Sequence, residues 1–283
     1  MNRTDEIEIV AIDGAFGAEI RGVELARPLD DATFAKIERA FAEHLLLCFP
    51  DQHLSEAQQV AFSRRFGELQ VHVLQEYRHP QFPEIYVISN VDPATDRPIG
   101  RHPDPGTLVW HSDLSFQRRT ASATILYGRE TPMQGADTQY ADMAAAYAAL
   151  PDNLRRKVEG RRALHDLDYS RSRAGAARMT EDQRRAAPPV LHPMVRRHKV
   201  TGRESLYISH HISAIEGLPA AESRDLLAEL MEHATRPRFV LSHRWRQHDL
   251  VMWDNRPTMH RATAFDTGAE RRVMHRTVVL DSI

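Results

Sequence analysis

Apolar side chains recur at helical spacing early in the chain and lead into a short apolar run. Phe34, Ile37 and Phe41 are separated by three and then four residues, which places them on one face of a helix. Asp30 precedes them and is a favourable N-cap residue. The pattern predicts a helix that begins after this aspartate and is followed by a buried strand at residues 45–49.

The next apolar segment carries a second helix signal. Ser55 and Gln58 have the spacing of a capping box, and Gly67 is placed to end the helix that follows. Residues 76–108 are rich in proline and show little helical period. We therefore expect a long loop there, with one strand inside it at residues 85–90.

Short runs of β-forming residues dominate from residue 107 onward. The expected strands are 107–111, 121–127, 206–209, 239–245, 250–254 and 272–281. Helical inserts are expected at 142–150 and 220–234. This pattern predicts a mainly β fold with flanking helices and a barrel or jelly-roll core. The Arg- and Ala-rich segment 166–189 fits either a lid over a site or a solvated surface insertion.

Size and charge narrow the function classes. The 283 residues are 42% hydrophobic, and no linker or internal repeat interrupts the first hundred, so we expect a single domain over residues 1–283. The 37 Lys and Arg residues balance 39 Asp and Glu residues, which gives a net charge of -2. With this balance the protein has no overall positive potential that would attract a phosphate backbone or an anionic lipid surface. We expect no nucleic-acid or membrane partner, and we expect a homo-oligomer.

The cysteine content and the N-terminal residues bear on the compartment. The single cysteine, Cys48, lies in an apolar run and is expected to be a small buried hydrophobe. The first ten residues lack the apolar core of a signal peptide, and no stretch approaches the ~18 apolar residues of a membrane span. We therefore expect a cytoplasmic location.

Two His-X-Asp triplets are candidates for metal binding. His102 and Asp104 lie among prolines and a glycine, where turn geometry gives their side chains no common face. His111 and Asp113 follow the apolar residues 107–110 and are expected to continue a strand. Alternate residues of a strand project from one face about 6.6 Å apart, so His111 and Asp113 can converge on one ion.

A third ligand for that ion must come from elsewhere in the chain. His260, just beyond another expected strand, is the best candidate. Two histidines and one carboxylate form the facial triad of non-haem Fe(II), which leaves three octahedral positions open. The alternative is that these histidines are hydrogen-bonded structural residues at strand ends.

The last expected strand places two cations on one face. Alternation puts Arg272, Met274 and Arg276 on the same side, with the two arginines ~13 Å apart. If that side faces the interior, each guanidinium must be paired, which implies two small anions. If it faces outward, both are ordinary surface arginines.

Several sequence blocks then carry a resemblance to a known family. They are FGAEIRGVELARPL (16–29), WHSDLSF (110–116), GADTQYADM (135–143), WDNRPTMHRA (253–262) and RRVMHRTVVLD (271–281). In order along nearly the whole chain, they resemble the taurine dioxygenase/dichlorophenoxyacetate dioxygenase (TauD/TfdA) family of Fe(II)- and 2-oxoglutarate-dependent dioxygenases. The resemblance is greater to the dichlorophenoxyacetate branch. It implies a double-stranded β-helix (jelly roll, cupin-like) core.

The resemblance also implies roles for individual residues. His111, Asp113 and His260 would be the iron ligands, and Thr138 and Arg272 would hold the distal carboxylate of 2-oxoglutarate. Arg276 and His72 match positions that bind the anionic head of the substrate. Where taurine dioxygenase has an aromatic-containing segment at its pocket, this chain has Ser209, His210, His211 and Ile212, with Ile212 expected to contact substrate.

The implied activity is an oxidoreductase reaction that consumes Fe(II)-bound O2 and 2-oxoglutarate as co-substrates. It would hydroxylate a small organic anion, such as an aryloxyalkanoate carboxylate, and release succinate and CO2. For an aryloxyacetate, hydroxylation beside the ether oxygen gives a hemiacetal that breaks down to a phenol and glyoxylate. Two alternatives remain open at this point. One is the same chemistry on taurine, another sulfonate or an alkyl sulfate, and the other is a jelly-roll protein that binds a metal or ligand without turnover.

Overall fold

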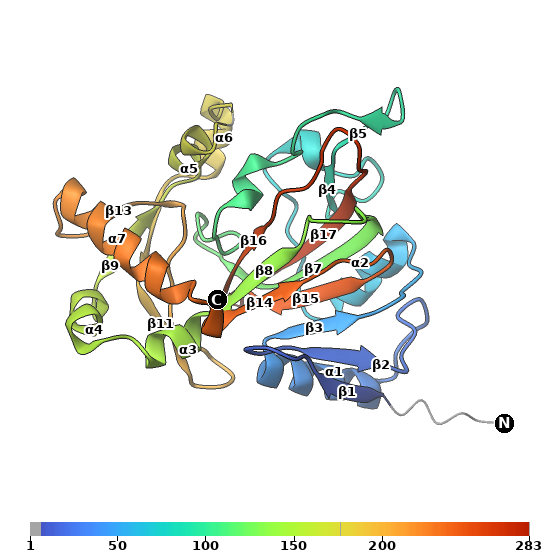
Figure 1. Ribbon diagram of the computed structural model, residues 1–283, viewed down its shortest axis with the longest axis horizontal. Coiled ribbons are helices and arrows are strands. Elements are labelled where there is room, and N and C mark those ends of the chain that lie inside the picture. The colour runs from blue at the N-terminus through green and yellow to red at the C-terminus, as the bar shows by residue number, and fades with distance from the viewer. Residues whose placement is uncertain (1–6, 176, 283) are drawn as a thin grey trace.

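The computed structural model describes residues 7–175 and 177–282, and most of its regular structure is β-strand with helices on the outside (Figure 1). Its largest sheet has seven strands in the order β1-β2-β3-β15-β7-β17-β4. These are β1 (Glu8–Ala11), β2 (Ala18–Arg21), β3 (Leu46–Phe49), β15 (Leu250–Asp254), β7 (Ala121–Glu130), β17 (Val273–Leu280) and β4 (Tyr86–Ser89). The expectation of a mainly β fold with flanking helices is confirmed.

A smaller sheet faces the large one. Its three strands run in the order β14 (Val240–His243), β8 (Thr138–Asp142) and β16 (Thr258–Ala262). A second three-stranded sheet contains β10 (Val190–Pro193), β9 (Arg162–His165) and β13 (Ile212–Ile215). Two short hairpins, β5 (Val91–Asp92) with β6 (Arg97–Pro98) and β11 (Val195–Arg197) with β12 (Glu204–Leu206), complete the strands that the structure describes.

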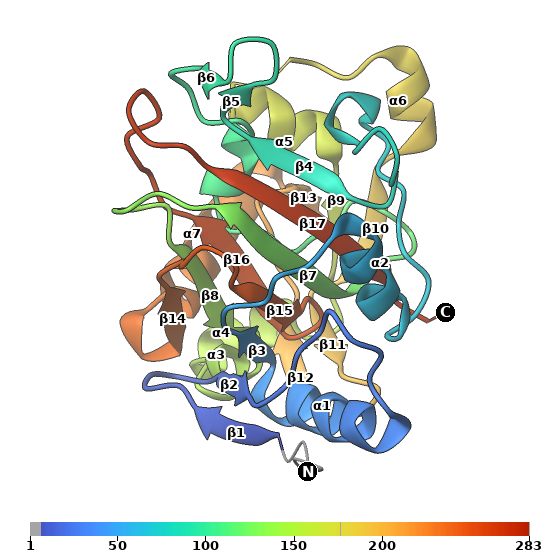
Figure 2. The same cartoon turned by 90° about the vertical axis from the view of Figure 1, so that its right-hand side faces the viewer.

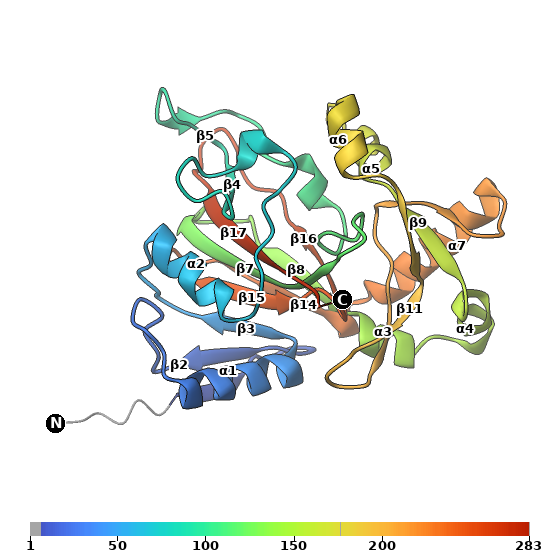
Figure 3. The same ribbon diagram turned by 180° about the vertical axis from the view of Figure 1, so that it is seen from behind.

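Two N-terminal helices cover the outer face of the large sheet (Figures 2 and 3). In α1 (Asp31–His44), the N-cap Asp30 accepts a hydrogen bond from the Thr33 amide. In α2 (Glu56–Arg64), Ser55 and Gln58 form the predicted capping box. Ile37, Phe41 and Phe62 from these helices pack in one cluster with Leu47 and Phe49 of β3 and with side chains of β7 and β15.

The other face of the large sheet is turned toward the smaller one. Leu46 and Cys48 of β3 pack with Trp253 and Met274 against Tyr140 of the facing sheet. Strand alternation therefore puts odd-numbered β3 residues under the helices and even-numbered ones between the sheets. Cys48 is only 4% exposed, as expected for a small buried hydrophobe. The space between the two sheets is where the polar residues described below converge.

The remaining helices lie beyond the smaller sheet or above its open end (Figure 1). They are α3 (Met143–Ala148), α4 (Asp152–Val158), α5 (Leu167–Arg173), α6 (Glu181–Ala186) and α7 (Ala220–Ala234), with short 3-10 turns at η1 (Gln75–Tyr77), η2 (Pro105–Leu108) and η3 (Pro237–Phe239). The segment 166–189 thus contains two short helices, and its residue 176 lies outside the described residues. No helix in the part of the chain that the structure describes is long and apolar enough to cross a membrane.

One expected strand is wrong. Residues 107–111 do not form a strand, because Pro105 starts the 3-10 turn η2 and the Asp104 carboxylate accepts a hydrogen bond from the Gly106 amide. Proline at the first position of such a turn and an Asx-type cap outweigh the β propensity of the following residues. The strands expected at 206–209 and 239–245 are also displaced or shortened, to β12 and β14. The strands expected at 121–127, 250–254 and 272–281 correspond to β7, β15 and β17.

Candidate functional site

Three buried side chains form a compact group between the sheets. One donor atom each from His111, Asp113 and His260 lies within 4.8 Å of the other two. His260 Nε2 is 3.6 Å from Asp113 Oδ2, and His111 Nε2 is 4.0 Å from Asp113 Oδ1. Each residue is 5% exposed. Two imidazoles and one carboxylate at this spacing can hold a divalent transition metal on one face.

The backbone brings these residues together differently from the expected strand. The His111 amide donates to the His260 carbonyl over 2.9 Å, and the His260 amide donates to the His111 carbonyl over 2.8 Å. This isolated antiparallel bridge fixes the two histidines side by side. Asp113 lies in the turn that follows, just before Leu114 with φ 55°. The expectation that His111 and Asp113 continue a strand is wrong, and a bridge plus a turn accounts for their proximity.

Neighbouring groups orient the three donors. His111 Nδ1 lies 2.7 Å from the Val109 carbonyl, so Nδ1 carries the proton and the Nε2 lone pair faces Asp113. Thr124 Oγ1 on β7 donates to Asp113 Oδ2 over 2.7 Å. Asn255 donates from Nδ2 to Thr124 Oγ1 over 2.8 Å and accepts the Asp113 amide at Oδ1 over 3.1 Å. Sequence reasoning did not single out Thr124 or Asn255, because a lone threonine in an apolar strand carries no metal signal.

The charge states of the group suit a metal ion. Burial raises the pKa of the Asp113 carboxyl, but the nearby Arg276 charge, the two histidines and the Thr124 hydrogen bond hold it well below its usual range. Burial lowers the pKa of both His111 and His260. At neutral pH the group therefore offers one anionic carboxylate and two neutral imidazoles, which is the protonation state that metal binding requires.

A buried cation without a carboxylate lies at the start of β17. Arg272 is 2% exposed, its Nε has no hydrogen-bond acceptor within the described residues, and burial lowers its pKa to about 10. Tyr140 interacts electrostatically with Arg272 and partly offsets the lowering of its pKa. The buried Tyr140 hydroxyl likewise has no hydrogen-bond partner within the described residues. Thr138 lies on the same face of β8, and its Oγ1 accepts from Trp245 Nε1 over 2.9 Å. An unpaired cation beside an unsatisfied hydroxyl fits a small buried anion.

The second arginine of β17 faces the three-residue group. Arg276 is 7% exposed and donates from Nη1 to Asp113 Oδ1 over 2.9 Å, while its Nε has no acceptor in the described structure. Of the two orientations that alternation left open, the inward one is therefore correct for both arginines. His275 and Thr277 lie on the opposite face, toward Glu56 and Ser63 of α2.

A cavity of about 70 Å³ contacts this group. His111, Asp113, Arg276 and His72 line it, together with Tyr86 and Phe116. His72 accepts the Leu74 amide at Nδ1 over 3.1 Å, which leaves the proton on Nε2. Burial and the Arg276 charge lower the pKa of His72 to about 3, so its ring is neutral and can donate from Nε2. Leu167, Ser170 and Arg171 of α5 close another side of the cavity.

Ile212 lies differently from expectation, whereas Asp104 lies outside the metal-binding group as expected. Ile212 does not line this cavity but a neighbouring cleft of about 500 Å³, together with residues of α5 and α7, and His210 lines both. Asp104 does line the cavity, where it accepts a hydrogen bond from the Tyr86 hydroxyl over 3.0 Å, but it is not part of the three-residue group. Tyr86, Phe116 and Arg171 were not predicted, because nothing in their local sequence distinguishes them from core or surface residues.

Several known proteins are similar to this chain in sequence and fold. Residues 8–278 match the family model described as taurine catabolism dioxygenase TauD, TfdA family. The chain is 41% identical to the alpha-ketoglutarate-dependent 2,4-dichlorophenoxyacetate dioxygenase of Cupriavidus pinatubonensis, over 95% of this chain and 96% of that protein. It is 37% identical to the (S)-phenoxypropionate/alpha-ketoglutarate-dioxygenase of Sphingobium herbicidovorans, over 97% and 95%. A crystal structure of AAD-2 in complex with Mn(II) and N-oxalylglycine is similar, with a TM-score of 0.87, 34% identity and 98% of both chains covered.

The matches show the enzyme class of this protein and, within that class, its family. The protein is an alpha-ketoglutarate-dependent dioxygenase, an oxidoreductase that uses Fe(II), 2-oxoglutarate and O2. Within that class, the chain belongs to the TauD, TfdA family. The family expected from the sequence blocks, and its greater similarity to the dichlorophenoxyacetate branch, are confirmed.

Proposed function

We propose that this dioxygenase hydroxylates aryloxyalkanoate carboxylates. The observation that carries the proposal is the position of Arg276, which lines the same small cavity as His111 and Asp113. An anionic head bound to this arginine is held beside the group that would hold the metal. The two relatives described above, named for dichlorophenoxyacetate and phenoxypropionate, support an aryloxy acid over a sulfonate.

The residues present fit the iron and the co-substrate. His111, Asp113 and His260 would hold Fe(II), and their neutral and anionic states require no proton to be displaced. Thr138 and Arg272 would bind the distal carboxylate of 2-oxoglutarate, which would satisfy the orphaned guanidinium. When bound, the iron couples oxidative decarboxylation of 2-oxoglutarate to removal of hydrogen from the substrate.

The contribution of the chain is to position the substrate. Arg276 would bind the carboxylate through its guanidinium, and His72 would add a hydrogen bond from its Nε2 proton. Tyr86 and Phe116 offer aromatic and apolar walls for the aryl ring. Holding the head and the ring at two points selects the carbon beside the ether oxygen for attack. The resulting hemiacetal breaks down to a phenol and, for an aryloxyacetate, glyoxylate.

The proposal includes the topology of the core and the role of two segments beside the cavity. The seven-stranded sheet and the β14-β8-β16 sheet would form a double-stranded β-helix of the jelly-roll, cupin-like type within one domain over 1–283. Antiparallel pairing within each sheet and the shared core between them support it. The segments 76–108 and 166–189 would act as lids, since Tyr86 and Asp104 of the first and Leu167 and Arg171 of the second line the cavity. A homo-oligomer and a cytoplasmic location stay predictions.

Succinate formation tests the function directly. The protein is loaded with Fe(II) and 2-oxoglutarate under air, and succinate and O2 uptake are measured with phenoxyacetate, both enantiomers of phenoxypropionate, taurine and an alkyl sulfate. We expect the highest kcat/KM among the aryloxy acids, with the matching phenol as product. A higher kcat/KM for taurine or the sulfate would contradict the proposed substrate class. Absence of substrate-stimulated succinate formation with every one of these compounds would place the substrate outside all three classes.

A further inference from the structure

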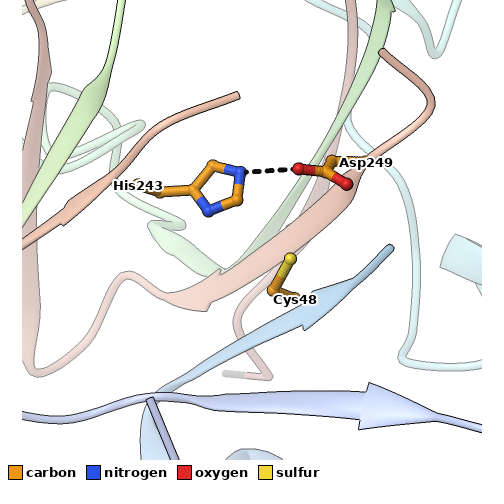
Figure 4. A group of neighbouring side chains, drawn as sticks. All are labelled: Cys48, His243 and Asp249. Atoms are coloured by element: carbon orange, nitrogen blue, oxygen red, sulfur yellow. Dashed lines mark ion pairs between the residues drawn. The ribbon is translucent and has the colours of Figure 1, made fainter. Parts of the chain in front are cut away.

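A second group of metal-binding side chains lies apart from the residues described above. It consists of Cys48 on β3, His243 at the end of β14 and Asp249 immediately before β15 (Figure 4). One donor atom of each residue lies within 4.8 Å of the other two. Figure 4 shows the thiol pointing toward the gap between the imidazole and the carboxylate. The proposed catalytic roles use none of these three residues.

The three side chains are turned toward one another but form no well-aligned hydrogen bond with one another in the described structure. His243 Nε2 lies 3.2 Å from Asp249 Oδ2, yet this buried nitrogen has no hydrogen bond of acceptable geometry. Asp249 is 3% exposed and Cys48 is 4% exposed. The Arg246 amide donates to Asp249 Oδ2 over 3.1 Å, whereas no hydrogen bond of Cys48 Sγ is present in the described structure. Such unsatisfied buried groups call for an additional ligand.

We propose that Cys48, His243 and Asp249 bind a zinc ion. A thiolate, an imidazole and a carboxylate are the ligand types that Zn²⁺ takes in proteins, with bonds of about 2.0–2.3 Å. Two N or O ligands at about 2.0 Å in a tetrahedron are about 3.3 Å apart. The separation of 3.2 Å between His243 Nε2 and Asp249 Oδ2 matches that spacing.

Charge favours the same ion. A thiolate, a carboxylate and a neutral imidazole together carry two negative charges, so a divalent cation makes the buried group neutral. Without an ion, burial and the Asp249 charge strongly raise the pKa of the Cys48 thiol, which stays protonated beside the carboxylate. Binding of the ion would release that thiol proton to solvent and form the sulfur–zinc bond. The chain supplies three ligands, and water would be the fourth ligand of a tetrahedral zinc ion.

The position of the group gives the ion a structural role. His243 belongs to the β14-β8-β16 sheet. Cys48 lies on β3 of the seven-stranded sheet, and Asp249 immediately precedes β15 of that sheet. The ion would therefore link the two sheets at the β14–β15 connection. The His243 ring also packs edge-on at 4.8 Å against Trp245, which donates to Thr138. The proposed zinc site thus adjoins a residue assigned above to 2-oxoglutarate.

Cobalt absorption provides the test, since the chain has only one cysteine. Metal-free full-length protein is titrated with Co²⁺, and near-ultraviolet thiolate-to-cobalt charge transfer is recorded. The His111, Asp113 and His260 group contains no sulfur, so only the Cys48 group can give this band. In His111→Ala, where the other group lacks one donor, we expect the band to saturate at one equivalent of Co²⁺ and to disappear on addition of Zn²⁺. We also expect Zn²⁺ to raise the Tm of His111→Ala.

Variants show whether all three residues are ligands. In the His111→Ala background, Cys48→Ala should abolish the band and the Zn²⁺-dependent increase in Tm, with Cys48→Ser as a second variant if the alanine protein does not fold. His243→Ala and Asp249→Asn should each weaken Co²⁺ binding at least tenfold, while His53→Ala, an exposed histidine beside the β14–β15 connection, should leave it unchanged. Absence of the band in folded His111→Ala protein with excess Co²⁺ would overturn the proposal. So would a band of unchanged affinity in both His243→Ala and Asp249→Asn.

Discussion

Arg276 donates a hydrogen bond from Nη1 to Asp113 Oδ1 over 2.9 Å while its guanidinium lies 4.4 Å from the centre of the Tyr86 ring. One side chain thereby contacts both the proposed metal-binding carboxylate and an aromatic wall of the proposed substrate cavity. Arg276 Nε is buried and has no acceptor within the described residues, and a substrate anion bound to the guanidinium would supply one. The metal and substrate sites are therefore connected by a single charged residue.

Replacing this residue should uncouple the reaction. In Arg276→Leu the three metal donors and Arg272 remain, so 2-oxoglutarate should still be consumed. The anionic substrate loses its anchor, and its target C–H is no longer held beside the oxidant. We expect slow succinate formation with little phenol from phenoxyacetate, and a weaker effect of the same kind in His72→Ala. Succinate and phenol are measured in the same reaction, and a wild-type ratio in Arg276→Leu would contradict the anchoring role.

Metal binding should distinguish the two His-X-Asp triplets. His111→Ala or Asp113→Ala removes a donor from the converging group, and we expect Fe(II) affinity to fall by more than about 100-fold. His102→Ala and Asp104→Ala should leave that affinity within a few-fold, since neither residue belongs to the group. Titration of metal-free protein measures all four affinities. Equal losses in both pairs would show that the wrong triplet has been identified.

Thr124 should act on the metal through Asp113. Thr124→Val keeps the shape of the side chain but removes the donor to Asp113 Oδ2 and the acceptor of Asn255 Nδ2. We expect metal affinity to fall by about 10–100-fold, the range typical of groups that orient a ligand. Thr120→Val, a buried threonine that is not bonded to Asp113, is the matched control. A Thr124→Val protein with unchanged metal affinity would make this hydrogen bond unimportant for the site.

Arg272 should control the dependence on 2-oxoglutarate. Arg272→Gln removes a buried cation that no carboxylate satisfies among residues 7–175 and 177–282, and a lost charged hydrogen bond is worth about 1.5–3 kcal/mol. The KM for 2-oxoglutarate should therefore rise by roughly 10- to 150-fold, while metal affinity changes little. Initial rates over a range of 2-oxoglutarate concentrations measure the effect, and Arg272→Lys should recover part of it. An unchanged KM in Arg272→Gln would place the co-substrate elsewhere.

Buried histidines should make the protein acid-sensitive. His165 is fully buried with both ring nitrogens unsatisfied, and burial together with the neighbouring His192 lowers its pKa to about 3. Below an unfolded-state pKa of about 6.5 the unfolded chain takes up a proton that the folded protein does not, so the free energy of unfolding falls with pH. The contribution of this residue is about 1.4 kcal/mol per pH unit and levels off near pH 3.

The test removes the titrating group. We expect His165→Leu to lose about 2 kcal/mol less stability than the wild type between pH 6.5 and pH 5, measured by urea unfolding at both values. Exposed His53, whose side chain is 68% accessible, provides the control variant His53→Leu. Equal losses in wild type and His165→Leu would mean that His165 is protonated in the folded protein.

Local rules predicted those parts of the fold in which one signal dominated. The capping box of Ser55 and Gln58 and the alternation around Arg272 and Arg276 depend on nearest neighbours, and the structure agrees with both. The strand at 107–111 failed because the Asp104 cap and Pro105 outweighed the β propensity of the residues that follow. His111 meets His260 all the same, through a bridge to a strand far along the chain that propensity does not report, and a turn brings Asp113 beside them.

The candidate site was predictable only where the residue types themselves carry chemistry. Histidine, aspartate and arginine at strand ends stand out in a sequence. Thr124, Asn255 and Phe116 do not, because their part in the site depends on which strands lie opposite one another. Ile212 illustrates the same limit, since it begins β13 after a turn and lines the neighbouring cleft.

The backbone bridge between His111 and His260 reduces the conformational entropy that metal binding must overcome. Joining two residues separated by about 150 positions costs about 4 kcal/mol of loop-closure entropy in a flexible chain. Here the paired amides and carbonyls of His111 and His260 close that loop in the folded protein without an ion. Metal binding at this group therefore requires little further ordering of the chain. Iron loss and unfolding should consequently be separable events, so that a chelated protein stays folded and can be reloaded.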